Sequence, residues 1–176
     1  MSLNAYRMDS RTEEAFIRDI AVGTVAERDI ILRYAHYVKR IYDIDIVVTD
    51  NGCDNSGQFL TESQVTTKAD FLINGKPAEV KFNNAILSKF RAKASQVGSY
   101  YKQGASIIWV NGYLSKCPKF TLITVEKLLQ IMNTLTQEPF EVWGGKMCYV
   151  LDSNDYDWFD LDKLDFEIAP KKEEVA

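Results

Sequence analysis

The sequence is poor in the residues that most often bind transition metals or form disulfides. Among 176 residues there is one histidine, His36, and there are three cysteines, Cys53, Cys117 and Cys148. A single histidine excludes His-rich zinc sites, and a histidine-based catalytic triad would have to use that residue. The cysteines are odd in number, widely spaced and without a C-x-x-C pair, which indicates a reducing compartment without structural disulfides or an iron–sulfur cluster. Catalysis by this chain is therefore expected to rest on carboxylates, lysine and tyrosine.

Long apolar runs are missing as well. No segment approaches the roughly 20 apolar residues that a membrane helix needs, and no signal peptide is recognisable. The chain nevertheless has 46% hydrophobic and 12% aromatic residues. This content is enough for one sizeable core and too high for a disordered chain. We therefore expect a single cytoplasmic domain over residues 1–176, with no membrane partner.

Acidic residues are absent from the middle of the chain. The net charge is −4, which excludes a bulk-basic protein that coats DNA. Residues 80–125, however, contain seven lysine and arginine side chains and no Asp or Glu, whereas residues 150–176 hold nine acidic and three basic side chains. The middle block predicts an anion-binding surface, and an ordinary solvated face is the alternative.

Hydrophobic spacing and turn residues predict a mixed α/β protein. The helices are expected over Thr12–Ala21 (ending near Gly23), Thr24–Tyr42, Ser88–Gln103 and about Val125–Asn133. The strands are expected over Ile44–Val48, Thr67–Ile73, Pro77–Phe82, Ala105–Val110, about Phe120–Ile123 and about Met147–Leu151. Ser88 would be the N-cap of the third helix, and Gly104 would follow its last turn.

The strongest local signal is Asn74-Gly75, because both residues tolerate the positive φ of a type I′ hairpin turn. A two-residue loop there places Asp70 directly opposite Glu79 on a non-hydrogen-bonded rung, with Cα atoms about 4.5 Å apart. Side-chain alternation puts Lys81 on the same face as the two carboxylates. The other face is apolar and expected to be core: Ala69, Phe71, Ile73, Ala78, Val80 and Phe82.

Two opposed carboxylates repel each other unless a cation lies between them. Oxygen-only ligation suits Mg²⁺ or Mn²⁺, so Asp70 and Glu79 are expected to bind one of these ions. Lys81 would orient or help deprotonate an attacking water and stabilise a pentavalent phosphate. The alternative is a solvated hairpin face on which Asp70 pairs with Lys81, and Glu79 pairs with Lys68.

Glu27 is a third acidic candidate. It lies in line with Ile31, Tyr34 and Val38 on the apolar stripe of its helix, so its side chain is expected to face the sheet. In that position it would supply a further metal or water contact. The alternative is a capping box in which Glu27 reaches back to the backbone N–H of Thr24.

The helix expected over Ser88–Gln103 has a polar stripe beside its apolar one. The polar stripe contains Lys89, Lys93, Gln96 and Tyr100 at helical spacing. A stripe of this kind suits contacts with the phosphate backbone of DNA, and a solvated helix face is the alternative.

A helical Glu27, Asp70 on one strand, Glu79-Val80-Lys81 on the next and a helix after them together resemble the PD-(D/E)xK nuclease superfamily. The segment Gly23-Thr24-Val25-Ala26-Glu27-Arg28 is similar to the first motif of archaeal-type Holliday junction resolvases. The segment Gln96-Val97-Gly98-Ser99-Tyr100 is similar to the Gln-x-x-x-Tyr motif of exonuclease-like members. One departure is that Asp70 follows Lys68-Ala69 and lacks the eponymous proline.

This resemblance implies a restriction-endonuclease-like αβββαβ core with a mixed central sheet flanked by helices. The nuclease core would cover about residues 23–110, and a C-terminal extension about 111–176. It also implies a metal-dependent nuclease that hydrolyses DNA phosphodiester bonds, with Asp70, Glu79, Lys81 and Glu27 as catalytic residues. The cofactor would be Mg²⁺ or Mn²⁺.

Several alternatives stay open at this level. Endonuclease and exonuclease action are not distinguished, nor is the preferred DNA structure, and a homodimer is one option because resolvase-like members need two subunits for paired cuts. The rivals are a non-catalytic DNA-binding or assembly protein that keeps the fold, and an RNA-directed nuclease. The acidic C-terminus, with Tyr156, Trp158, Phe159 and Phe166, is most simply a packed edge element. It would otherwise compete with DNA for the basic surface or contact a partner.

Overall fold

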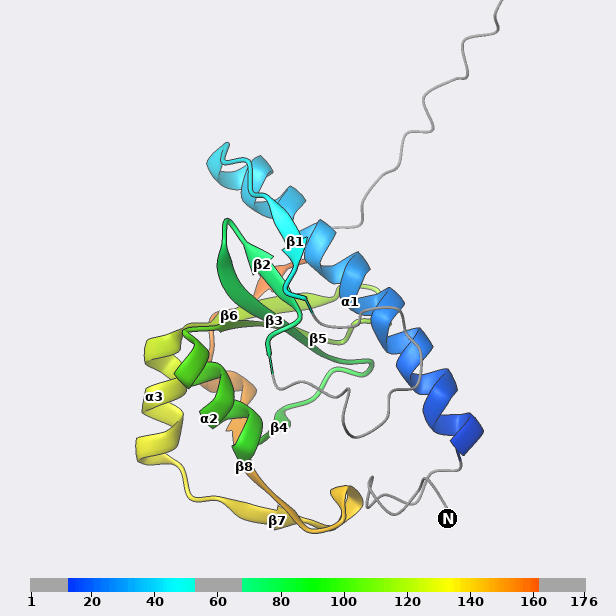
Figure 1. Cartoon of the computed structure of the whole chain (residues 1–176), viewed down its shortest axis with the longest axis vertical. Helices are drawn as coiled ribbons and strands as arrows, with labels where there is room; N and C mark the ends of the chain where they lie inside the picture. The colour runs from blue at the N-terminus through cyan, green and yellow to red at the C-terminus, as the bar shows by residue number, and fades with distance from the viewer. Residues whose placement is uncertain (1–12, 53–67, 162–176) are drawn as a thin grey trace, which may run out of the picture.

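The computed structural model describes residues 13–52 and 68–161, which form a mixed α/β fold with helices on both faces of a mixed sheet (Figure 1). The helices are α1 (Glu13–Tyr42), α2 (Ala94–Gln103) and α3 (Val125–Thr134), with short 3₁₀ turns η3 (Glu141–Trp143) and η4 (Ser153–Asp155). The six-stranded sheet contains, in spatial order, β1 (Val48–Asp50), β2 (Phe71–Ile73), β3 (Lys76–Asn83), β5 (Ser106–Asn111), β6 (Lys119–Ile123) and β9 (Phe159–Asp160). The three-stranded sheet contains β4 (Lys89–Lys93), β8 (Lys146–Asp152) and β7 (Glu138–Phe140), in that order.

Strand β3 is a central strand of the large sheet. It pairs antiparallel with β2 and parallel with β5, where Val80 lies opposite Ile108. Parallel neighbours need a crossover connection, and here β4 and α2 lie between β3 and β5 in the chain. This crossover brings β4 and α2 near the strand that carries Glu79 and Lys81.

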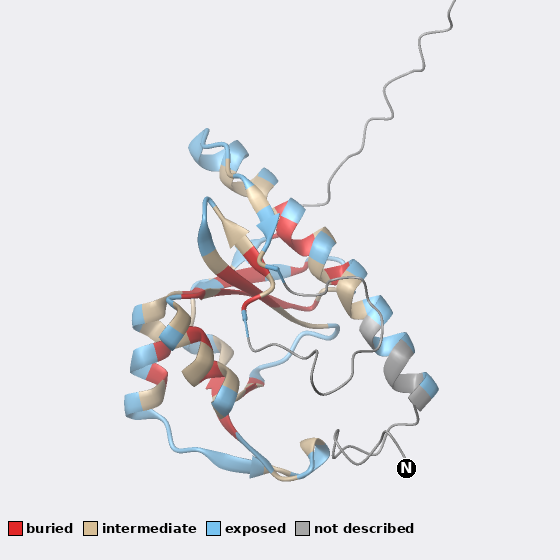
Figure 2. Ribbon diagram, viewed as in Figure 1, coloured by how far each residue is buried: buried red, intermediate tan, exposed pale blue. Residues whose placement is uncertain are grey.

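Two apolar cores lie on opposite faces of the large sheet. On one face Ile30 and Ile31 of α1 pack with Phe71, Val80 and residues of β5 and β6. On the other face α2 and α3 pack with alternate residues of β5 and with the small sheet. Figure 2 shows the buried residues along the central strands and on the inner sides of the helices. Because both faces are covered, a charged side chain in the middle of β3, such as Glu79, is buried.

The hairpin and several later elements confirm the sequence predictions. Asn74 and Gly75 have φ values of 49° and 78°, as a type I′ turn requires. Leu72 pairs with Pro77 and Ile73 with Lys76, which is the expected register. The predicted elements near β5, β6, α3 and β8 are also present. Ala69 is an exception on the expected core face, since it precedes β2 and packs in the core on the α2 side.

The two N-terminal helices of the prediction are one continuous helix, so the break expected near Gly23 is wrong. Gly23 lies inside α1. An interior glycine costs only about 1 kcal/mol, and the packing of Ile30 and Ile31 on the sheet offsets such a cost. The predicted start at Thr12 lies outside the described residues.

The helix predicted over Ser88–Gln103 is also wrong in its first third. Lys89–Lys93 form β4, which pairs antiparallel with β8, and the helix starts only at Ala94. Phe90 and Ala92 alternate into the core, and this burial with the ladder to β8 outweighs the helical spacing of the segment. Ser88 is therefore not the N-cap, whereas Gly104 ends the helix in the left-handed conformation as predicted.

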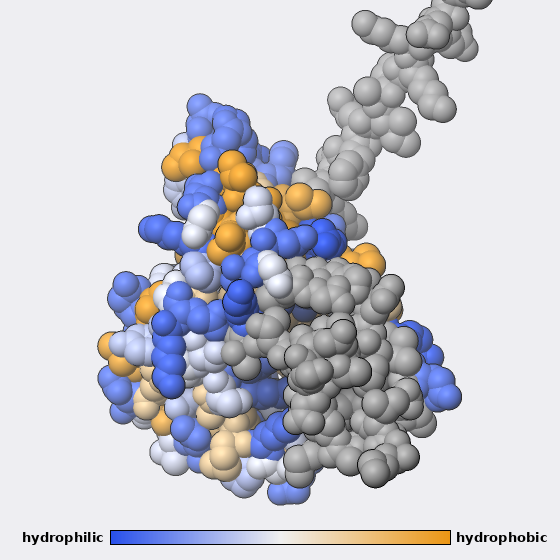
Figure 3. Space-filling view, viewed as in Figure 1, coloured by the Kyte–Doolittle hydropathy of each residue, from blue (hydrophilic) through white to orange (hydrophobic). Residues whose placement is uncertain are grey.

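Strands β1 and β2 differ from the predictions at their ends. Strand β1 starts at Val48 rather than Ile44, because α1 ends at Tyr42 and the chain turns through Asp43 with a φ of 54°. Ile44 and Val47 are exposed, and Figure 3 shows hydrophobic surface in the region where Figure 1 places the end of α1 and β1. Strand β2 is shorter than predicted and begins at Phe71; Thr67 lies outside the described residues.

The described part of the C-terminal block forms an edge element, as its simplest interpretation predicted. Strand β9 pairs with β6 at the edge of the large sheet, and Tyr156 and Trp158 pack against the core on the α2 side. Phe166 lies outside the described residues. Neither β7 nor β9 was predicted. None of the helices within residues 13–52 and 68–161 is long and apolar enough to cross a bilayer.

Candidate active site

The hairpin brings Asp70 and Glu79 together, as its register predicted. Asp70 lies one residue before β2, and its backbone N–H donates a hydrogen bond to Glu79 Oε2 at 3.2 Å. Glu79 lies in the middle of β3 and is only 2% exposed. Both carboxyl groups are thus held by the short connection through Asn74 and Gly75.

Glu79 has further partners on its own strand and on α2. Lys81 Nζ forms an ion pair with Glu79 Oε1, and the Tyr100 side chain is hydrogen-bonded to Glu79. Lys81 Nζ lies 5.9 Å from the centroid of the Tyr100 ring. The solvated hairpin face considered as an alternative is therefore wrong for Glu79, because this carboxylate is buried and its cation is Lys81.

Lys81 is held in its charged form. Burial alone would lower its pKa, but the attraction of Glu79 and then of Tyr100 outweighs burial and raises the pKa above its ordinary value. For Tyr100 burial acts in the other direction and is the main cause of its raised pKa. A lysine with a raised pKa does not accept a proton at neutral pH, so Lys81 is suited to binding an anion rather than to acting as a base.

Glu27 faces the same site from α1. Burial, the charge of Asp70 and the charge of Glu79 raise the pKa of Glu27 to about 7, against the opposing effect of Lys81. Burial and the charge of Glu79 raise the pKa of Asp70 to about 6. We call Glu27, Asp70, Glu79 and Lys81 the carboxylate cluster. The capping box proposed as an alternative role for Glu27 is wrong, because Thr24 lies inside α1 and not at its start.

The donor set of the carboxylate cluster fits a hard divalent cation. It offers only oxygen ligands, and three acidic groups are opposed by one lysine, so bringing in positive charge would relieve the repulsion that raises two of the pKa values. Within residues 13–52 and 68–161, no three His, Cys, Asp or Glu side chains have the spacing of a metal site. Magnesium often binds through one or two carboxylates and keeps several waters, so Asp70 and Glu79 would suffice.

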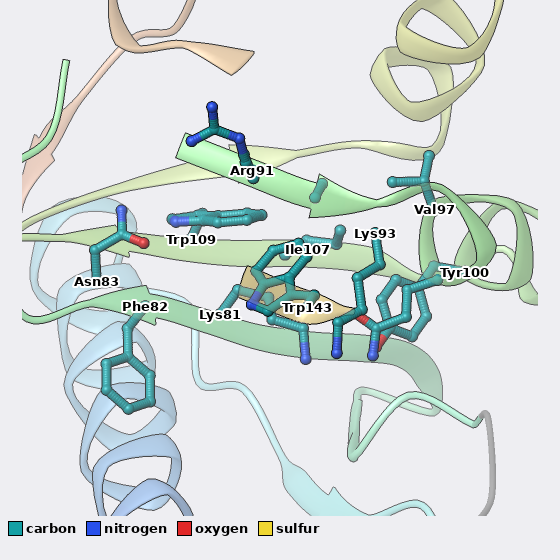
Figure 4. A pocket seen from close by; sticks show the side chains of 12 residues that line it. Lys81, Phe82, Asn83, Arg91, Lys93, Val97, Tyr100, Ile107, Trp109 and Trp143 are labelled. Atoms are coloured by element: carbon teal, nitrogen blue, oxygen red, sulfur yellow. The ribbon is translucent and has the colours of Figure 1, made fainter. Parts of the chain in front are cut away.

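A cavity of about 240 Å³ adjoins this cluster and is lined by residues of β3, β4, β5, α2 and η3 (Figure 4). Three of the four residues predicted to contact DNA line it, and Lys89 does not. The cavity-lining residues used below are Lys81, Arg91, Lys93, Gln96, Tyr100 and Trp143. Lys93 reaches the cavity from a strand and not from the predicted helical stripe.

The sequence interpretation missed Arg91 and Trp143 at this cavity. Arg91 lies on the same face of β4 as Lys93, because alternate residues of a strand share a face. The run Lys89-Phe90-Arg91-Ala92-Lys93 alternates polar and apolar residues, and this period would have identified Arg91. Trp143 comes from η3, far along the chain, and no local pattern in the sequence connects it with β4.

Comparison with known proteins identified no relative of this chain. No protein-family model matched it, and neither did any curated protein or solved structure.

Proposed function

We propose that this protein is a divalent-metal-dependent deoxyribonuclease that hydrolyses DNA phosphodiester bonds. The observation that carries the proposal is the carboxylate cluster. Asp70 and Glu79 are opposed across a tight hairpin, Glu79 is paired with a charged Lys81, and a cavity with basic lining adjoins them. This combination provides a place for a cation and a place for a phosphate side by side.

The chain order of the elements supports membership of the PD-(D/E)xK superfamily. Elements α1, β1, β2, β3, α2 and β5 follow the αβββαβ order that the resemblance implies, with β4 inserted before α2. The acidic residues and Lys81 lie on α1, just before β2 and on β3, in the sequence order of the family motif. We propose on this basis that residues 23–110 hold a restriction-endonuclease-like core.

The proposed mechanism assigns a separate task to each group. Asp70 and Glu79 would hold Mg²⁺ or Mn²⁺, which when bound polarises the phosphate and activates water. Glu27 would accept a hydrogen bond from the attacking water. Lys81, fixed in its charged form beside Glu79, would stabilise the negative charge that develops on the phosphate. Lys93, Gln96 and Tyr100 would position the strand.

The test is a cleavage assay with a panel of plasmid, linear duplex, single-stranded, four-way-junction DNA and RNA, in Mg²⁺ or Mn²⁺. The wild type should cut at least one DNA, and Lys81→Ala should lower the rate by about a hundredfold or more. Lys76→Ala is the matched control, since Lys76 is an exposed lysine on the same strand. The proposal is wrong if no DNA is cut or if Lys81→Ala cuts as fast as wild type.

Removing Lys81 leaves Glu79 buried without its cation, which can unfold the protein. The double variant Glu79→Gln/Lys81→Met removes both charges and guards against this outcome. It should fold and still fail to cut. Cleavage of RNA alone would assign the site to an RNA-directed nuclease.

A second candidate is a non-catalytic DNA-binding protein with the same fold. The observation in its favour is that Glu79 already has three partners within the protein: Lys81, Tyr100 and the Asp70 backbone N–H. This candidate predicts salt-sensitive DNA binding that needs no metal and does not change in Asp70→Asn.

A further inference from the structure

The cavity beside Lys81 has the charge of an anion site. Lys81, Arg91 and Lys93 line it, and there is no Asp or Glu among its described lining residues. Figure 4 shows the amino groups of Lys81 and Lys93 on the same side of the cavity, near Trp143. Glu79 neutralises part of the charge of Lys81 from the side of the hairpin. Glu138 Oε1 lies 3.6 Å from Arg91 Nη2 and offsets the charge of Arg91 in part. Three cations against two carboxylates leave the cavity with a net positive charge next to the proposed position of the reacting phosphate.

The same cavity has an aromatic wall. Trp143 is half-buried, and Lys93 Nζ lies 5.2 Å from its ring centroid. Trp109 also lines the cavity, is 4% exposed and has a buried indole Nε1 with no hydrogen-bond partner. That N–H is buried in the core, so a ligand in the cavity would meet the Trp143 ring and the basic side chains instead. A planar ring attached to a phosphate matches both the aromatic wall and the charge.

The size of the cavity limits what enters it. A volume of about 240 Å³ is below the roughly 300–1,000 Å³ of pockets for drug-sized ligands. A space of this size matches a single nucleotide better than a base pair. A nucleotide in a continuous duplex reaches such a pocket only after unpairing and unstacking, whereas a single strand has no pairing to lose.

We propose that this cavity binds one unpaired nucleotide of a DNA strand, with its base against Trp143 and its phosphate between Lys81 and Lys93. The site therefore prefers DNA that has unpaired nucleotides to continuous duplex. This inference rests on the proposed function for its choice of DNA, but binding without metal tests it independently of cleavage.

The experiment measures DNA binding by fluorescence anisotropy in EDTA, where metal-dependent cleavage cannot occur. The probes are a labelled oligodeoxythymidylate, a blunt hairpin duplex and an oligouridylate of matched length. The single-stranded DNA should bind at least several-fold more tightly than the duplex. Trp143→Ala should weaken single-strand binding by roughly tenfold, the effect of losing one stacked base, and Trp143→Phe should restore most of it.

Val142→Ala is the matched control, because Val142 lies on the same turn, is 66% exposed and does not line the cavity. It should bind like the wild type. In the wild type, single-stranded DNA should also quench tryptophan fluorescence. The quenching should persist in Trp158→Phe, because Trp158 does not line this cavity, and it should fall in Trp143→Phe.

Three outcomes overturn the inference: equal or tighter binding of the duplex, wild-type single-strand binding by a folded Trp143→Ala, or tighter binding of the oligouridylate. Failure of cleavage in the earlier assay together with the expected binding here would reject the nuclease and keep the nucleotide site. Cleavage in the earlier assay without a preference for single-stranded DNA here would keep the nuclease and reject the nucleotide site.

Discussion

Helix α1 contributes to two clusters of charged side chains that differ in their balance of positive and negative charge. The Arg33 cluster consists of Asp29, Arg33 and Tyr113. Arg33 donates to Asp29 at 3.2 Å and to the carbonyl oxygen of Leu161 at 2.6 Å, and the Tyr113 hydroxyl donates to Asp29 at 2.9 Å. One cation and one anion face each other here, and the hydrogen bonds tie α1 to the end of the described chain.

The carboxylate cluster has three acidic groups and one lysine. Its imbalance is visible in the raised pKa values of Glu27, about 7, and Asp70, about 6. Burial and mutual repulsion both disfavour the charged forms. The first cluster therefore has the character of a structural contact, and the second is the one in which we propose that a cation binds.

The largest effect on stability is expected in the Arg33 cluster. Arg33→Ala removes a cation whose side chain is 7% exposed. The Leu161 carbonyl oxygen loses this donor, and Asp29 keeps only the Tyr113 hydroxyl. The free energy of unfolding in urea should fall by about 2–4 kcal/mol, while cleavage per folded molecule stays the same. A loss below about 0.5 kcal/mol would show that this cluster does not hold the fold together.

A substitution in the carboxylate cluster is expected to raise stability rather than lower it. Asp70→Asn removes one of the repelling charges, so the metal-free protein at pH 8 should gain about 1–2 kcal/mol of stability. Asp29→Asn is the matched control and should lose stability, because Asp29 faces Arg33. If the two variants change stability in the same direction, the contrast between the clusters does not hold.

The stability of the metal-free protein should fall as pH rises, and Mg²⁺ should offset this loss. The folded state raises the pKa values of Asp70 and Glu27, so it binds protons more tightly than the unfolded chain. Without metal, the contribution of these groups to stability is greatest at acid pH and is lost as pH rises from about 4 to about 7. Mg²⁺ should therefore raise the melting temperature more at pH 8 than at pH 5. Equal shifts at both pH values, or a shift that survives in Asp70→Asn, would contradict this expectation.

The smallest effect is expected from a change that touches neither cluster. A Cβ added at Gly23 would have no heavy atom within 4 Å, and Gly23 lies inside α1. Gly23→Ala should raise the free energy of unfolding by about 0.5–1 kcal/mol without changing cleavage or its pH dependence. A change in cleavage would show that the position of α1, and not its charges, limits the reaction.

Local signals in the sequence were sufficient to predict the hairpin. Asn74-Gly75 determines the turn type, and the turn type determines which residues are opposed, so the contact between Asp70 and Glu79 followed from neighbouring residues alone. The helical phase of Glu27 was predictable for the same reason, because its spacing from Ile31 is that of one helix face.

Long-range pairing explains what the sequence did not predict. Phe90 fits both a helical stripe with Ala94 and a strand alternation with Ala92. The segment forms a strand because it pairs with β8, which lies more than fifty residues later in the chain. The aromatic wall of the cavity also depends on long-range pairing. The turn that carries Trp143 lies between β7 and β8, and their pairing in the small sheet accompanies the contact of Trp143 with Lys93. The contact of Trp143 with Lys93 leaves no periodic pattern in the chain, whereas the alternation of Lys89–Lys93 is a local signal that competes with the helical spacing.

The most direct test of the central claim is the single-turnover cleavage rate of Asp70→Asn beside that of Asp29→Asn, in saturating Mg²⁺ on the DNA that the wild type cuts best. Both variants neutralise one aspartate near α1, but only Asp70 belongs to the carboxylate cluster. Cleavage by Asp70→Asn should fall by about a hundredfold or more, while that of Asp29→Asn should stay within a few-fold of wild type. A folded Asp70→Asn that cuts at the wild-type rate would contradict the assignment of the carboxylate cluster as the catalytic site.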